Sequence, residues 1–222
     1  MSTTVLHART LPGDAEQRWP ARLWGVLAVL CLVVFLDGLD GSMISIALPS
    51  VGHDLGMGTA SLQWIVNGYY LGYGGLLLLG GRAADMLGRR RVFLIALGVF
   101  AAASLLSSVA ASGSLLIATR FVKGVAAAFT APASLSLLTT TFPEGAQRNG
   151  ALSVFSLFGA LGYSLGLVLG GVLDGFGWRY VFLMPVPLAL LALVVGWKLI
   201  SRDRRPRPGR RDHADRGRRR VR

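Results

Sequence analysis

Four charged residues lie well inside long apolar stretches, away from their ends, where ionised side chains are costly and are by default functional candidates. Asp37 and Asp40 are three residues apart in one stretch, and Arg120 and Lys123 are three apart in another. At helical spacing, each pair shares one helix face. Carboxylates exchange protons, and nearby cations hold them ionised. The pattern predicts proton-coupling or substrate-binding chemistry, with Asp40, and secondarily Asp37, paired to Arg120 and Lys123.

A second pattern occupies a short charged segment between two apolar stretches. It reads Gly81-Arg82-Ala83-Ala84-Asp85-Met86-Leu87-Gly88-Arg89-Arg90-Arg91. Glycines permit a sharp turn, an aspartate can accept from a helix amino terminus, and arginines can pair with carboxylates or lipid phosphates. We expect a tight loop with a conformational role, although an ordinary basic loop beside a membrane remains the alternative.

A third pattern is a row of glycines four residues apart. Gly162, Gly166 and Gly170 follow this spacing, and Gly171 comes directly after them. Small residues at this interval allow two membrane helices to approach closely. We therefore expect these glycines to pack one helix against another.

The sequence argues against most catalytic chemistry. Gly162-Tyr163-Ser164-Leu165-Gly166 fits a nucleophile elbow, but that motif needs a strand–turn–helix setting and a histidine base, and no apolar stretch contains histidine. Cys31 is the single cysteine. There is no metal-ligand spacing and no phosphate-binding Gly-x-x-x-x-Gly-Lys-Ser/Thr stretch. We expect neither an enzyme nor a metal or cofactor site.

These residues require membrane-spanning helices to position them. The chain has 222 residues, of which 53% are hydrophobic and 15% charged, against about 25% charged in soluble domains. A span needs roughly 20 apolar residues. Six stretches qualify, which predicts an all-α polytopic membrane protein with six transmembrane helices in one bundle. They cover residues 23–48, 62–79, 92–111, 115–138, 151–172 and 180–200.

The charges predict the orientation, because cytoplasmic loops carry the excess of Lys and Arg. Basic residues gather before the first span, after the second, fourth and sixth spans, and in the last 21 residues, which hold 11 of the 23 Lys and Arg. We expect a polar amino terminus (residues 1–21), a transmembrane bundle (22–200) and a disordered Arg-rich tail (201–222), with both termini cytoplasmic and the protein in the plasma membrane. No nucleic-acid partner is expected.

At these motifs the chain resembles the major facilitator superfamily. Residues 81–91 are similar to its signature Gly-x-Leu-Ala-Asp-x-x-Gly-Arg-Lys/Arg, with Ala83 at the leucine position. Residues 40–49 and 62–71 resemble spans one and two of the fourteen-span drug:proton antiporters, and Trp178-Arg179-Tyr180 resembles their entry to span six. The resemblance covers residues 36–200. It implies that residues 81–91 act as a latch between transporter halves.

Residues 120–128 resemble the span-four motif Arg-x-x-Gln-Gly-x-Gly-Ala-Ala, whose arginine the resemblance implicates in proton coupling. Lys123 replaces the glutamine. It either balances Asp37, favours an anionic substrate, or extends toward water. In the span-five motif Gly-x-x-x-Gly-Pro-x-x-Gly-Gly, Leu167 replaces the proline, which leaves the direction of transport open.

The resemblance implies a proton-coupled secondary transporter that exports drug-like or hydrophobic small molecules, with the bilayer, protons and the substrate as partners. The family binds substrate between two six-span bundles, and six spans are seen here. A second bundle would come from homodimerisation or from a separate chain. The alternative is a truncated half-transporter, or a membrane interaction protein, with no transport activity alone.

Overall fold

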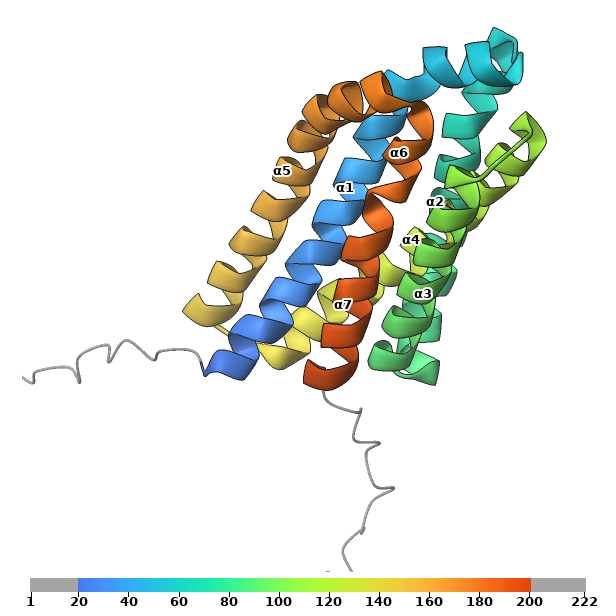
Figure 1. Cartoon of the computed structure of the whole chain (residues 1–222). Coiled ribbons are helices and arrows are strands. Elements are labelled where there is room, and N and C mark those ends of the chain that lie inside the picture. The colour runs from blue at the N-terminus through green and yellow to red at the C-terminus, as the bar shows by residue number, and fades with distance from the viewer. Residues whose placement is uncertain (1–19, 201–222) are drawn as a thin grey trace, which may run out of the picture.

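The computed structural model describes residues 20–200 and consists of helices joined by short links (Figure 1). The tail predicted for residues 201–222, and all but the last two residues of the predicted segment 1–21, lie outside the described residues. The helices are α1 (Ala21–Leu55), α2 (Thr59–Leu87), α3 (Arg89–Ser108), α4 (Gly113–Thr141), α5 (Ala146–Phe176), α6 (Trp178–Leu183) and α7 (Pro185–Leu199). Residues 20–200 contain no strand, and the all-α membrane fold is confirmed.

Five helical segments within residues 20–200 are long and apolar enough to cross a membrane. They are α1, α3, α4, α5 and the α6–α7 segment Trp178–Leu199. The second predicted span corresponds to α2, which has 29 residues but falls outside this set, because polar and glycine residues lower its hydropathy. α2 nevertheless packs extensively against α4, as α1 does against α5, and so belongs to the same bundle.

The helix ends differ from the expected ones. The first predicted span ends at residue 48, but α1 continues through Pro49 and ends at Leu55, where Gly56 adopts a left-handed conformation. A membrane helix tolerates an internal proline when only one backbone hydrogen bond is lost. A helix break occurs instead within the sixth predicted span, between α6 and α7 at Met184 and Pro185.

The expectation of a tight loop at residues 81–91 is also wrong. α2 extends to Leu87, α3 begins at Arg89, and Gly88 alone joins them. The segment before Gly88 is rich in good helix formers, so the helix continues past the apolar stretch. Gly88 has a φ of 98°, which L side chains rarely adopt, and this lets the chain reverse in one residue.

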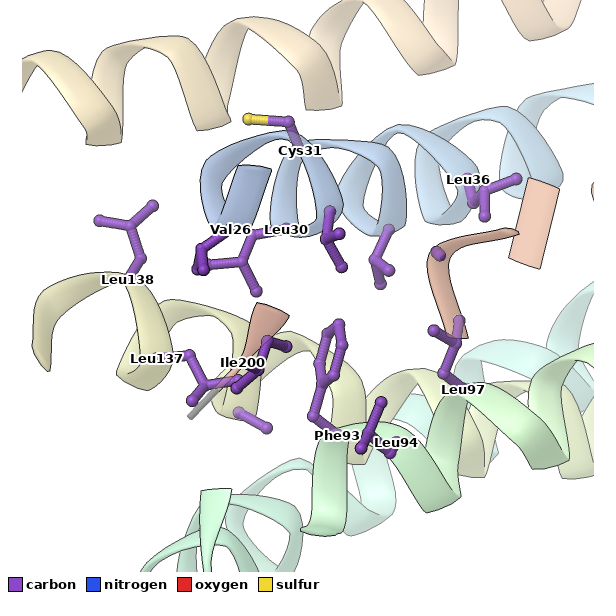
Figure 2. Close-up of a cluster of buried hydrophobic side chains, with 14 of the residues drawn as sticks. Val26, Leu30, Cys31, Leu36, Phe93, Leu94, Leu97, Leu137, Leu138 and Ile200 are labelled. Atoms are coloured by element: carbon purple, nitrogen blue, oxygen red, sulfur yellow. The ribbon is translucent and has the colours of Figure 1, made fainter. Parts of the chain in front are cut away.

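Two hydrophobic clusters fill the bundle. One occupies the end where α1 begins and α7 ends, and Figure 2 shows its side chains meeting from α1, α3 and α4. Phe93 points there from α3 toward α1. The other lies toward the opposite end, around Leu39, Met43 and Phe182. Arg22 donates to the carbonyl of Leu199, so both ends of the described chain lie together (Figure 1).

Candidate functional site

Between the two hydrophobic clusters lies a buried group of three charged side chains, Asp40, Arg120 and Lys123. Arg120 Nη1 donates to Asp40 Oδ2 at 2.5 Å, and Lys123 Nζ donates to the other oxygen, Oδ1. The side chains are 3%, 1% and 0% exposed, respectively. The pairing of Asp40 with both cations that we expected from the sequence is therefore present.

Neighbouring helices complete the surroundings of the two cations. Arg120 Nε donates to the carbonyl of Ile65 at 3.4 Å, and its guanidinium lies 4.7 Å from the centre of the Tyr69 ring. Lys123 Nζ lies 4.8 Å from the Phe100 ring centre and 5.6 Å from that of Phe182. These contacts supply cation–π attraction where water is excluded. Sequence analysis missed these neighbours.

Asp37 lies one helical turn from Asp40 but differs from it. Its side chain is half-buried, and it forms no hydrogen bond or ion pair with any residue that the structure describes. Its charge is close enough to act on Asp40, Lys123, Tyr69 and Tyr73. The secondary expectation, a direct pairing of Asp37 with the cations, is therefore wrong.

The contacts of Lys123 bear on the hypotheses that the sequence allowed for this side chain. The ammonium group is fully buried and bonded to Asp40, so the side chain does not extend toward water. Its ion pair is with Asp40 and not with Asp37, although the four charges together sum to zero. Asp40, Arg120 and Lys123 alone carry a net charge of plus one, which Asp37 balances from a distance.

The segment from Gly81 to Arg90 lies apart from this group, at the end shared by Ala21 and Leu199. Asp85 Oδ1 is 3.6 Å from Arg89 Nη2, and no side chain caps α3, so Asp85 does not serve as a helix cap. Arg90 donates to the carbonyl of Trp197 at 2.7 Å and lies over its ring. Gly81 lies within α2, Gly88 forms the link to α3, and Arg82 is exposed. Arg90 thus joins α3 to the end of α7.

Three of the four α5 glycines pack against α1. A side chain on Gly162 would collide with the Phe35 backbone, on Gly166 with Ser42 and Leu39, and on Gly170 it would press on Met43. Gly171 differs, because it is exposed and a Cβ there would lie 4.0 Å from Ile46. Close helix approach explains the first three glycines but does not require Gly171.

A polar cluster at the opposite end of the bundle was missed by sequence analysis. Trp178 Nε1 and Arg179 Nη1 donate to Asp54 Oδ2 at 2.8 and 2.7 Å. Ser50 donates to Asp174 at 2.6 Å. These bonds tie α1 to the junction of α5 and α6. In the sequence, Trp178 and Arg179 stood out only through the family resemblance. Both side chains are hydrogen-bond donors, however, and therefore need an acceptor.

Comparison with known proteins decides the family. Residues 30–221 match the sequence model described as the Major Facilitator Superfamily. This chain belongs to the major facilitator superfamily. Solved structures of superfamily transporters agree in fold, including a bacterial homologue of the human lysosomal transporter Spinster (TM-score 0.72, 20% identity, 84% of this chain and 44% of that one). The D-xylose–proton symporter gives 0.67, with 20% identity over 78% and 47% of the two chains.

Relatives within the superfamily carry names from drug resistance and export. The puromycin resistance protein pur8 of Streptomyces alboniger is 44% identical over 92% of this chain and 40% of its own length. The cephamycin export protein CmcT of Amycolatopsis lactamdurans is 44% identical over 83% and 38%. The multidrug efflux pump LfrA of Mycolicibacterium smegmatis is 38% identical over 86% and 38%. This chain spans about two fifths of the length of these relatives.

Proposed function

We propose that this chain acts in proton-coupled export of hydrophobic small molecules across the plasma membrane. The observation that supports this most is the buried group of Asp40, Arg120 and Lys123. A buried ion pair is weak evidence for stability, because the desolvation of its members offsets their attraction. Charges within membrane spans instead mark ion and substrate pathways. The resistance and export names of the relatives favour export and drug-like cargo.

The proposed orientation places both termini in the cytoplasm. The turn at Gly88 carries Arg89, Arg90 and Arg91, and Arg148 lies at the same end of the bundle, just after the α4–α5 link. The opposite end carries Arg179, which is paired with Asp54. The excess of cations at one end follows the positive-inside rule.

Transport also calls for a second bundle, since family resemblance implies a substrate site between two bundles. We propose that a second copy or a separate chain supplies it. The exposure of α5 supports a second bundle. In its most apolar stretch 11% of the residues are buried, against 50% in the corresponding stretch of α1. The alternative function is that of a membrane interaction protein, or half-transporter, without transport activity alone.

Reconstitution of the full chain into liposomes that enclose a pH-sensitive dye tests the proposal. Puromycin and a hydrophobic cationic dye are the probes. Addition of either is expected to move protons across the membrane. Arg120→Gln leaves Asp40 paired with Lys123, so the fold should persist while drug-driven proton flux falls to the level of protein-free vesicles. Glu144→Gln, which alters an exposed surface pair with Arg148, is the matched control and should retain the flux.

Two results would count against the proposal. Proton movement equal to that of protein-free vesicles for every probe would favour the interaction-protein alternative. Undiminished flux in Arg120→Gln would remove the buried group from the coupling mechanism. Chemical crosslinking of the reconstituted chain, read as dimer or monomer, tests the second copy separately.

A further inference from the structure

The two acidic residues of α1 are placed in different chemical situations. Both carboxylate oxygens of Asp40 are taken, Oδ2 by Arg120 and Oδ1 by Lys123. Protonating Asp40 would forfeit two charge-assisted hydrogen bonds, which are about twice as strong as neutral ones. It would also leave two cations buried without a counter-charge. Asp40 is therefore built to stay ionised.

Asp37 has no comparable restraint. No donor among residues 20–200 bonds to it, and its side chain is only half-buried, whereas Asp40 is 3% exposed. Adding a proton to Asp37 breaks no hydrogen bond and relieves the repulsion between two carboxylates one turn apart. Partial exposure also leaves the side chain outside the fully packed core, and a proton carrier requires such access.

Lys123 is the residue that creates this difference. Its ammonium group reaches Asp40 from α4 and is enclosed by Phe100 and Phe182. A glutamine, as in the motif that residues 120–128 resemble, would offer Asp40 a neutral partner. Arg120 would then be the single cation on that carboxylate.

We propose that Asp37, and not Asp40, is the carboxyl group that takes up and releases the transported proton, and that Lys123 assigns this role by holding Asp40 ionised. The inference rests on the proposed proton-coupled function. In the uptake step, a hydronium ion transfers its proton to a carboxylate oxygen of Asp37, which forms one O–H bond and leaves water. Release to water on the other side of the membrane reverses this step.

The surroundings of Asp37 define the charges that the step changes. Asp40 lies one turn away on the same helix, Lys123 acts on Asp37 from α4, and Tyr69 and Tyr73 interact with it from α2. Arg120, also on α4, is bonded to Asp40. The charged residues of α3, α5, α6 and α7 are confined to the ends of those helices. Proton uptake therefore changes the net charge of the four side chains Asp37, Asp40, Arg120 and Lys123 from zero to plus one.

Infrared difference spectroscopy of the full chain in lipid bilayers tests the assignment directly. Acidification is expected to produce the carbonyl band of a protonated carboxylic acid in an apolar setting. In Asp37→Glu, which keeps the carboxyl group and the fold, this band should move to the frequency of a glutamic acid. In Asp37→Asn it should vanish, while circular dichroism shows an unchanged helix content.

The role of Lys123 has its own readout. In the double variant Asp37→Asn/Lys123→Gln, a pH-dependent carboxylic band should return, because Asp40 has lost one of its two cations. Its absence would overturn the role of Lys123. A band that stays unmoved in Asp37→Glu would overturn the assignment to Asp37, whether or not the chain transports. Failed transport with a band that moves would count against the proposed function alone.

Discussion

Asp40 remains charged inside the bundle because each of its carboxylate oxygens accepts a hydrogen bond from a cation. Transfer of an isolated ion into an apolar interior costs several kcal/mol even after relaxation, and good pairing offsets much of this cost. The three side chains are thus energetically dependent on one another. Removing Asp40 alone should be worse than removing it together with one cation, because the single removal leaves two buried cations without a counter-charge.

This dependence gives a stability prediction. Asp40→Asn leaves Arg120 and Lys123 without a counter-charge and should lower the free energy of unfolding by about 3–5 kcal/mol. Asp40→Asn/Lys123→Met removes one charge of each sign and should recover part of that loss. Denaturant titration in detergent micelles measures both. Equal losses in the free energy of unfolding of the two variants would show that the charge of Lys123 does not contribute to the loss.

The residues around the charged group divide into those that a sequence can reveal and those that it cannot. Asp40, Arg120 and Lys123 stand out because charges in apolar stretches are rare. Phe100 and Phe182 do not, because an aromatic side chain in a span has no mark that separates a cation neighbour from ordinary core or lipid-facing residues. Their contacts depend on how α3 and α6 are rotated, which hydropathy does not report.

At the scale of elements, hydropathy located the helices but misplaced their ends. It detects the part of a helix that meets hydrocarbon, whereas the helix continues as long as its backbone bonds can form. α1 therefore runs beyond Pro49, and residues 81–87 extend α2. The glycines of α5 were recognised by spacing alone, but only the structure separates Gly171, which faces outward, from the three that contact α1.

The α1–α5 contact supplies a matched pair of substitutions in one helix. Gly162→Ala forces a Cβ into the Phe35 backbone and should cost about 1–3 kcal/mol of stability through overpacking. Gly171→Ala adds the same atom 4.0 Å from Ile46 and should be nearly neutral. Thermal unfolding of the two variants in detergent compares them. Equal midpoints would show that close approach of these helices is not required.

For the whole molecule, the arrangement of the links predicts which residues face each side of the membrane. Ser112 lies in the α3–α4 link, at the end opposite to Ala21 and Leu199, whereas Glu144 lies in the α4–α5 link at their end. A thiol placed at either position is exposed, and the native Cys31 is buried. With cytoplasmic termini, Ser112 faces outside.

Labelling with a membrane-impermeant maleimide checks this orientation. Ser112→Cys should react in intact cells, whereas Glu144→Cys should react only after the membrane is permeabilised. The unmodified chain, which has Cys31 alone, serves as the blank. The reverse pattern would place the termini outside and contradict the positive-inside assignment.

The single-residue link at Gly88 has a consequence for how the protein is made. α2 is less apolar than its neighbours, and insertion by the translocon depends on the hydrophobicity of each segment. Because one residue joins α2 to the more apolar α3, the second helix follows the first from the ribosome without a spacer, with three arginines just after the turn. We therefore expect α2 to enter the bilayer together with α3, so that this pair, and not the single helix, is the unit of biogenesis.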